Sequence, residues 1–169
     1  MSARIVVLMQ TFLPYPEFAR TAGCLDMRRL GKQRVEALQV LRVLTVAGYG
    51  WRHHPAVRMW TGYEEALVRY GLEICDAWCA TGRADTCANS MRADLAAACG
   101  IDVVRGQAAL SAAAGLPPWL GREDVHRSHR SALLRKDPDH YRPLFGDEPG
   151  DLPYVWPQSD RDPGCDRNR

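Results

Sequence analysis

The chain has 169 residues, of which 46% are hydrophobic and 25% charged, with a formal net charge of +2 at pH 7. These values are ordinary for one globular domain whose core needs no staples. Uninterrupted apolar runs such as residues 5–9 are far too short to cross a membrane. The sequence does not open with a basic segment followed by a long apolar region, so no secretory signal is expected and the expected compartment is the cytoplasm.

Six cysteines occur in the chain, and no two of them have the CxxC spacing of a zinc site. In the cytoplasm thiols are kept reduced. We therefore expect reduced cysteines that pack as small hydrophobic side chains, and no bound metal. They are Cys24, Cys75, Cys79, Cys87, Cys99 and Cys165.

The first half of the chain is predicted to be extended at its start and helical afterwards. Residues 5–13 are apolar and β-branched at first, which indicates an extended segment, and a short helix is expected over residues 16–25. Asp26 is a good N-cap for a helix over residues 27–47. A single long helix is expected over residues 55–81, because apolar residues recur near helical spacing from Pro55 to Gly82.

The second half is also predicted to be helical. The predicted fold class is therefore all-α: a single compact helical domain over residues 1–157, with an extended N-terminal segment. The polar residues 158–169 are expected to form a disordered tail. The remaining expected elements are helices at 85–99, 107–114 and 122–136, a turn at 138–145 and a docked segment at 152–157.

The helix over residues 27–47 carries the first candidate cluster. Arg28, Lys32 and Glu36 follow one another at i, i+4 spacing and share a face, and Arg29 and Gln33 converge on the same carboxylate. Such a row can bind phosphate and hold a general acid or base. The alternative is a solvated ladder of ion pairs, which the spacing alone favours.

A second cluster lies in residues 126–136. His126, His129 and Arg130 share a helix face, so the two histidines could bind a metal with a third ligand, donate to phosphate or transfer protons. Histidines that are simply hydrogen-bonded in a packed interface are more common. Both this helix and the one over residues 27–47 are basic, which is compatible with an anionic partner such as nucleic acid.

Two smaller groups complete the candidates. Trp51 and His54 lie in a predicted loop and could stack on bases, although such residues more often belong to a core. Lys32 and Lys136 are possible imine-forming amines. No phosphate-binding glycine loop, nucleophile elbow or HExxH zinc motif is present.

Several segments resemble a family of small bacterial cytoplasmic proteins with no assigned function, which in turn resembles the pyrimidine-dimer DNA glycosylases of the phage endonuclease V type. The resemblance implies a single helical domain whose N-terminal α-amine attacks the sugar C1′, forms an imine and cleaves the strand by β-elimination. It also implies an assisting glutamate and arginines that hold phosphates around a flipped nucleotide. The segments are MQTFLPY (9–15), LDMRRLGKQRVEALQVLR (25–42), HPAVRMWTGYEEALVRYG (54–71), LPPWLG (116–121), HRSHRSALLRKDPDHYRPLF (126–145) and LPYVWP (152–157).

Two features depart from the glycosylase pattern. Arg34 matches the arginine of the family's Arg-Glu pair, but Val35 follows it. Glu36 comes one residue late and is expected to point about 100° away on a helix. The nucleophilic amine would belong to Ser2 after removal of Met1, or to Gln10 in a chain that starts at Met9.

The predicted function is base excision on damaged DNA, of glycosylase and AP-lyase type, through an amine nucleophile and without a cofactor. DNA is the expected partner, and no membrane is involved. Two alternatives remain: a metal- or phosphometabolite-dependent enzyme using His126 and His129, and a non-catalytic nucleic-acid-binding module. The candidate catalytic residues are Ser2, Gln10, Gln33, Glu36, His126 and His129, and the candidate nucleic-acid-binding residues are Arg28, Arg29, Lys32, Arg34, His54, Arg127, Arg130 and Lys136.

Overall fold

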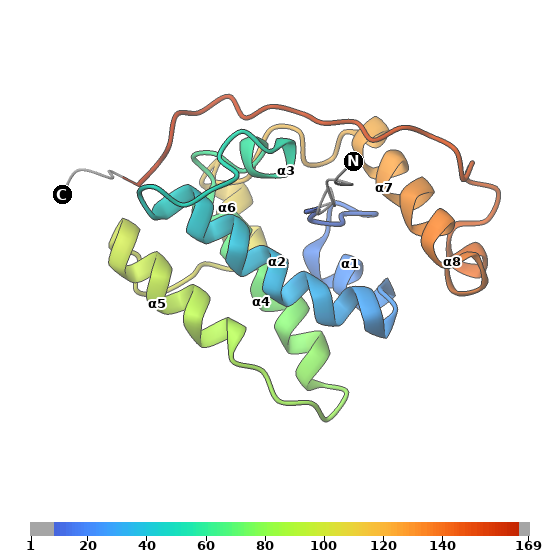
Figure 1. The fold of residues 1–169 in the computed structure, drawn as a ribbon, viewed down its shortest axis with the longest axis horizontal. Helices are drawn as coiled ribbons and strands as arrows, with labels where there is room; N and C mark the ends of the chain where they lie inside the picture. The colour runs from blue at the N-terminus through green and yellow to red at the C-terminus, as the bar shows by residue number, and fades with distance from the viewer. Residues whose placement is uncertain (1–8, 166–169) are drawn as a thin grey trace, which may run out of the picture.

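The structure, a computed structural model, describes residues 9–165 (Figure 1). Within this range the chain forms eight helices and no strand, which confirms the all-α, single-domain prediction. None of these helices is long and apolar enough to cross a membrane. The helices are α1 (Phe18–Cys24), α2 (Met27–Thr45), α3 (Pro55–Arg58), α4 (Glu64–Cys79), α5 (Cys87–Cys99), α6 (Gln107–Ala112), α7 (Glu123–Lys136) and α8 (Pro138–Phe145).

Helices α2 and α4 pack against each other at the centre, with α5 against both and α1 against α4. Helix α2 begins where predicted, because the Asp26 side chain accepts hydrogen bonds from the backbone nitrogens of Arg28 and Arg29. Its apolar face, which includes Leu41, meets Leu67 of α4 in the core. The two central helices therefore hold the polar residues of α2 in fixed positions.

The prediction of a single helix over residues 55–81 is wrong, because α3 and α4 are separate helices. Gly62 lies between them with a φ of 78°, a left-handed value that favours glycine. A Cβ atom at this position would also meet Arg161 Cβ at 2.5 Å. The break lets the Trp60 side chain turn into the core, where it is fully buried.

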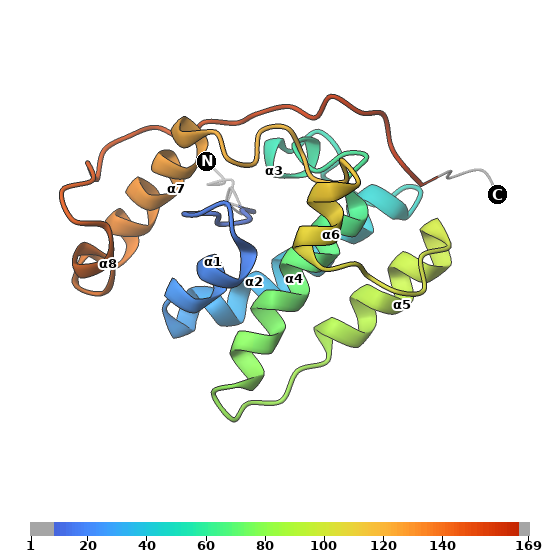
Figure 2. The same ribbon diagram turned by 180° about the vertical axis from the view of Figure 1, so that it is seen from behind.

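Helices α7 and α8 form a hairpin that packs against the N-terminal segment, as both views of the ribbon show (Figures 1 and 2). The turn expected over residues 138–145 is a short helix, capped by the Asp137 side chain, which accepts from the His140 backbone nitrogen at 3.1 Å. Residues 9–13 have no regular secondary structure and lie between α7 and the central helices. The residues ahead of Met9 in the expected extended segment lie outside the described range.

The C-terminal segment, residues 146–165, runs along one edge of the molecule from α8 past α7 and α3 towards α5 (Figure 1). Beyond residue 157 it is not a disordered tail: Ser159 donates to the Thr61 carbonyl oxygen at 2.5 Å, and Asp160 accepts from the Tyr63 hydroxyl at 2.6 Å. The expectation of disorder is thus wrong for residues 158–165, because polar side chains find partners on the body. Residues 166–169 lie outside the described range.

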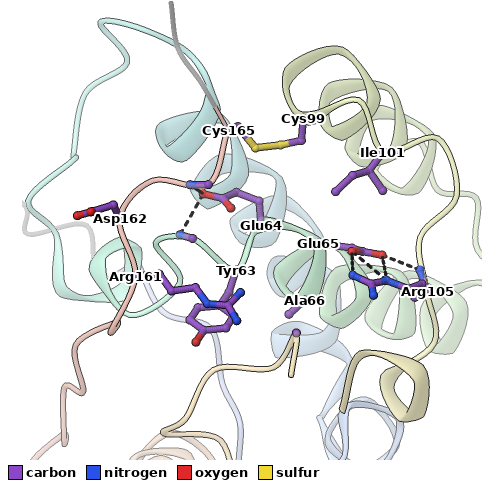
Figure 3. A pocket seen from close by; sticks show the side chains of 13 residues that line it. Tyr63, Glu64, Glu65, Ala66, Cys99, Ile101, Arg105, Arg161, Asp162 and Cys165 are labelled. Carbon is purple, nitrogen blue, oxygen red and sulfur yellow. Dashed lines mark hydrogen bonds and ion pairs between the residues drawn. A yellow bond between two sulfur atoms is a disulfide. The ribbon is translucent and has the colours of Figure 1, made fainter. Parts of the chain in front are cut away.

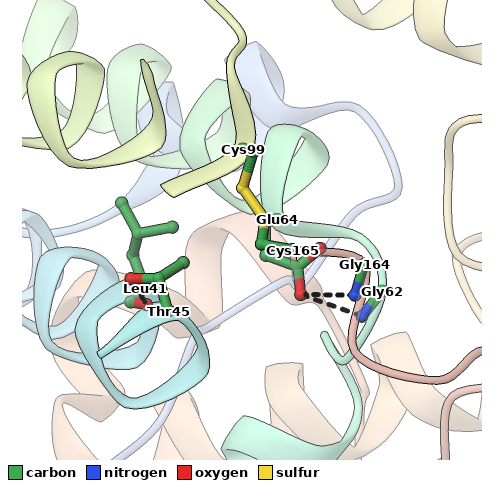
Figure 4. The surroundings of a disulfide bond; sticks show 7 residues. All are labelled: Leu41, Thr45, Gly62, Glu64, Cys99, Gly164 and Cys165. Atoms are coloured by element: carbon green, nitrogen blue, oxygen red, sulfur yellow. Dashed lines mark hydrogen bonds between the residues drawn. A yellow bond between two sulfur atoms is a disulfide. The ribbon is translucent and has the colours of Figure 1, made fainter. Parts of the chain in front are cut away.

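Cys165 at the end of this segment forms a disulfide with Cys99 at the end of α5 (Figure 4). The path of the C-terminal segment brings the two Cα atoms to 4.9 Å, which a disulfide requires. The expectation that all six cysteines are reduced is therefore wrong for this pair. The free cysteines of the described chain are Cys24, Cys75, Cys79 and Cys87.

Candidate functional site

A buried polar network joins the N-terminal segment to α2, and Gln33 is its centre. The Gln33 amide nitrogen donates to the Gln10 carbonyl oxygen at 2.9 Å and to Glu36 Oε2 at 2.7 Å. Its amide oxygen accepts from the Phe12 backbone nitrogen at 2.9 Å and from the Tyr70 hydroxyl at 2.7 Å. Gln33 therefore uses both ends of its side chain to fix the chain at Gln10 beside Glu36.

Glu36 faces the N-terminal segment directly. The Gln10 backbone nitrogen donates to Glu36 Oε2 at 3.3 Å, and Lys32 Nζ lies 3.3 Å from Oε1. The Glu36 side chain is only 5% exposed. Burial raises the pKa of Glu36, and the nearby Lys32 ammonium offsets part of this rise. A carboxyl group with a raised pKa holds its proton more readily and can both accept and return one, as a general acid or base must.

Glu36 is displaced by one residue from the family's glutamate position, yet it meets the N-terminal segment at the Gln10 nitrogen. Segment 9–13 crosses α2 where Gln33 and Glu36 stand one turn apart. These two residues share a helix face. The crossing point, and not the position next to Arg34, thus decides which carboxylate meets the segment.

Two further side chains hold this crossing in place. The Trp60 indole nitrogen donates to Thr11 Oγ1 at 2.9 Å, and the Tyr70 hydroxyl also lies 2.9 Å from the Phe12 carbonyl oxygen. Thr11, Trp60 and Tyr70 are all fully buried. Buried hydrogen bonds of this kind allow little displacement, so the Gln10 nitrogen is held beside Glu36.

His126 and His129 bind the backbone of the same segment one step further along. The Leu13 nitrogen donates to His129 Nδ1 at 2.8 Å, and His126 Nδ1 lies 2.8 Å from the Leu13 carbonyl oxygen. His126 Nε2 accepts from the Gly121 nitrogen at 2.9 Å. Burial lowers the pKa of both imidazoles, that of His129 to about 3. These contacts favour two neutral histidines that position the segment.

These contacts give little support to the alternative in which His126 and His129 bind a metal. Backbone groups occupy three of the four ring nitrogens of His126 and His129, and only His129 Nε2 has no partner in the described structure. Over residues 9–165, no group of three or more His, Cys, Asp or Glu side chains is placed to hold a metal ion. His54, a candidate nucleic-acid-binding residue, caps α3 by accepting from the Ala56 nitrogen at 3.1 Å.

Lys32 pairs with Glu36, and the charges of Arg29, Lys32, Glu36 and Arg135 all act on Lys136; we call the four basic residues Arg29, Lys32, Arg135 and Lys136 the basic cluster. Arg29 also pairs with Asp26 at 3.5 Å, and Arg135 donates to the Gly150 and Leu152 carbonyl oxygens at 2.9 Å. Lys136 Nζ lies 5.9 Å from the centre of the Phe12 ring. Partial burial lowers the pKa of Lys136, and the positive charges of Arg29 and Lys32 lower it further. Arg28, one turn ahead of Lys32, is exposed. The structure thus brings basic residues of α2 and α7 close to one another on the side where Lys32 pairs with Glu36.

Three of the predicted nucleic-acid-binding arginines are engaged elsewhere. Arg34 pairs with Asp85 at 2.5 Å and stacks on the Trp78 ring. Arg127 and Arg130 both pair with Glu148, at 2.8 and 2.9 Å. Arg130 also donates to the Pro14 carbonyl oxygen at 2.9 Å. The structure therefore does not bring these residues to Glu36 as free cations. Ser2 lies outside the described residues.

Several site residues were missed in the sequence. Tyr70 carries a hydroxyl on the apolar face of α4, and a buried tyrosine usually needs a hydrogen-bond partner, so this signal could have been found. Arg135 adjoins Lys136 and could have been included with it. Tyr154 reaches the site from the C-terminal segment, with its ring centre 6.0 Å from that of His129. The sequence around Tyr154 gives no indication of this contact.

A cavity of about 320 Å³ lies elsewhere, between the start of α4 and the C-terminal segment (Figure 3). Arg105 pairs with Glu65 at 2.6 Å beside it, and Glu64 accepts from the Gly62 nitrogen at 3.1 Å. None of the candidate residues lines this cavity. We place the candidate site at Glu36, because a carboxyl group with a raised pKa lies there beside the Lys32 amine, the Gln10 nitrogen and the basic cluster. A reaction needs such groups more than it needs a large cavity.

Residues 9–91 match the sequence model of a family described as pyrimidine dimer DNA glycosylase. Over these residues the chain resembles the pyrimidine dimer DNA glycosylases. The match to this glycosylase family begins one residue before Gln10 and includes Gln33, Glu36 and Tyr70, but not α7. The all-helical architecture agrees with the endonuclease V-like class that the resemblance implies. Comparisons with curated proteins and with solved structures found no match.

Proposed function

We propose that this protein is a DNA-repair glycosylase with AP-lyase action, in which an α-amine at Gln10 is the nucleophile and Glu36 manages protons. One observation carries the proposal: the Gln10 nitrogen lies 3.3 Å from a buried carboxylate whose pKa is raised. The family match supports it, since the matching region starts at Met9. An amine and a carboxyl group in contact are the two groups that imine-forming base excision needs.

The chemistry requires a chain that begins at Gln10, because an α-amine then replaces the peptide nitrogen at this point. The neutral amine attacks C1′ of the damaged nucleotide, and the bond from C1′ to the base breaks as the base takes up a proton. Opening of the sugar ring gives an imine, with Glu36 returning a proton to the ring oxygen. Loss of a C2′ proton then expels the 3′ phosphate by β-elimination. Glu36 is placed to accept and deliver these protons.

The starting residue decides which amine is available. With Met9 attached, the Gln10 nitrogen is an amide and cannot act as this nucleophile. The α-amine of Ser2, left by removal of Met1, is the other candidate for a longer chain. Forms that start at Ser2 and at Gln10 should therefore be compared in every assay.

DNA phosphates are the proposed ligands of the basic cluster, together with Arg28. Each phosphate contact releases counterions, so binding should weaken steeply with salt. The pairing of Arg34 with Asp85 makes Arg34→Ala a poor test, because this change would disturb packing between α2 and α5. Arg28→Ala is the better one, since Arg28 is exposed. Action on chromosomal DNA also implies a cytoplasmic protein without a membrane partner, and this location is part of the proposal. The Cys99–Cys165 disulfide is then an exception to the reduced state of cytoplasmic thiols.

Strand cleavage of a duplex with one abasic site tests the proposal. The form that starts at Gln10 should cleave, and Glu36→Gln should lower the rate about 100-fold or more. Glu73→Gln is the matched control, because Glu73 is also in an i, i+4 ion pair, with Arg69, but on α4; its rate should equal that of the parent. Unchanged cleavage by Glu36→Gln would reject the proposal. Tight, salt-sensitive binding without cleavage by either form would instead favour the non-catalytic binding module.

A further inference from the structure

The chain has only two lysines among its 22 lysine and arginine residues. Lys32 pairs with Glu36, and Lys136 lies over the Phe12 ring of the segment that crosses α2 beside Glu36. Lys32 reaches Glu36 from α2, with Nζ 3.3 Å from Glu36 Oε1. Lys136 comes from the last turn of α7 and is close enough for the Glu36 charge to act on its pKa. Arginine cannot form an imine because its guanidinium stays protonated. The side-chain amines available for imine chemistry are thus confined to this one site.

The two lysines differ in their surroundings. The Lys32 side chain is 62% exposed, and its ammonium group is held in the ion pair with Glu36. Lys136 forms no ion pair with any described residue and lies over the Phe12 ring at 5.9 Å. Charged groups on two helices face Lys136: Arg29, Lys32 and Glu36 on α2, and Arg135 beside it on α7. Three of these four groups are cationic.

A nucleophilic amine must be free of its extra proton, and nearby cations together with partial burial favour the neutral form. Both influences lower the pKa of Lys136, and the Glu36 charge opposes them. The Phe12 ring also belongs to the N-terminal segment that Gln33 fixes beside Glu36. Lys136 and the Gln10 nitrogen therefore approach the same carboxylate from two different elements.

We propose that Lys136 Nζ is an imine-forming amine of the full-length chain, acting on the aldehyde of an abasic deoxyribose. This inference rests on the proposed function and deepens it, because it supplies a nucleophile for a chain in which Gln10 carries no free amine. The Lys136 amine adds to the C1′ aldehyde, and loss of one water gives the imine. Removal of a C2′ proton, for which Glu36 is the nearby base, then breaks the bond from C3′ to its phosphate oxygen.

Borohydride trapping on abasic duplex DNA tests this inference, because hydride reduces the imine to a stable secondary amine. The full-length chain and its Lys136→Arg variant are compared at DNA concentrations that saturate each protein. We expect the parent to form a covalent adduct and Lys136→Arg, which keeps the positive charge, to lose at least about tenfold in yield. Peptide mapping should place the adduct on Lys136 in the parent, and also in Lys32→Arg.

Two results would overturn the inference while leaving the proposed function standing. One is an undiminished adduct in Lys136→Arg, and the other is an adduct mapped to Lys32 or to the N-terminus of the full-length chain. An adduct in the form that starts at Gln10 and none in the full-length chain would also overturn it. If neither form gives any adduct, the proposed function itself fails, and the inference fails with it.

Discussion

The Gln10 backbone nitrogen donates a hydrogen bond of 3.3 Å to Glu36 Oε2, although 26 residues separate the two in the sequence. The bond exists because segment 9–13 crosses α2 at Gln33 and Glu36, one residue beyond the position at which the family's Arg-Glu spacing would place the carboxylate. Gln33 fixes both partners, since its amide nitrogen donates to the Gln10 carbonyl oxygen and to Glu36 Oε2. This pairing gives the site its acid-base group.

The raised pKa of Glu36 implies a specific dependence of stability on pH. The folded state binds the Glu36 proton more tightly than the unfolded state, whose reference pKa is 4.5. The free energy of unfolding should therefore fall as pH rises from about 4.5 through the raised pKa, and stay lower above it. In Glu36→Gln this fall should be absent, because an amide side chain does not titrate in this pH range. The amide oxygen can still accept from the Gln10 nitrogen.

Urea unfolding at several pH values between 4 and 8 checks this expectation. Relative to the parent, Glu36→Gln should gain stability as the pH rises. Glu73→Gln, with its partly exposed carboxylate, serves as the control. A parent protein that becomes more stable relative to Glu36→Gln at higher pH would show that burial does not dominate at this carboxyl group.

Gln33 should contribute more to stability than any exposed glutamine of α2. Gln33→Leu leaves the Phe12 nitrogen, the Gln10 carbonyl oxygen and the Glu36 carboxylate short of a partner. Each such loss costs about 1–3 kcal/mol, so unfolding should become easier by about 3 kcal/mol or more. The exposed Gln39 on the same helix offers a control, since Gln39→Leu should change stability by less than about 0.5 kcal/mol. Equal effects in chemical denaturation would contradict the network.

His129 should make the protein sensitive to acid. Its pKa is lowered from 6.5 to about 3 by burial. The unfolded state then binds the proton more tightly, so stability is fully present above pH 6.5 and is lost as the pH falls towards 3, by a total on the order of 5 kcal/mol. His129→Asn should show a weaker dependence on pH in this window, whatever its absolute stability. The exposed His53 gives the control, His53→Asn, and a parent-like slope in His129→Asn would refute the assignment.

The disulfide should stabilise the C-terminal segment against the body. It closes a loop with a sequence separation of 66 residues, which corresponds to about 4 kcal/mol in the loop-entropy treatment. Reductant should therefore lower the Tm of the parent to about that of Cys165→Ser, and should leave the Tm of Cys165→Ser unchanged. Cys79→Ser, at a free and exposed cysteine, is the control. Identical Tm values for oxidised parent and Cys165→Ser would show that the bond does not hold the segment in solution.

The helices could be predicted because their signals are local. Asp26 marks the start of α2, and the apolar spacing of α4 and α7 follows the helical repeat. The break at Gly62 could not be predicted from spacing, because the apolar pattern continues through it; contact with Arg161, far along the chain, requires the glycine there.

The candidate site was predicted in its residue types but not in its arrangement. Gln10, Gln33 and Glu36 were all candidates, yet the orientation of Glu36 depends on where residues 9–13 cross α2. That crossing is set by Trp60 and Tyr70, which contact Thr11 and Phe12 from other helices. Arg34 and Arg130 read as free cations in the sequence, because their partners Asp85 and Glu148 are distant along the chain.

The most direct test of the account is borohydride trapping with the form that starts at Gln10, prepared by proteolytic removal of a leader and checked by intact mass for an uncyclised terminal glutamine. The account expects a covalent adduct with abasic duplex DNA, mapped to the N-terminal peptide and strongly reduced in Glu36→Gln. If the form that starts at Gln10 gives no covalent adduct, Gln10 and Glu36 do not act together as a catalytic unit.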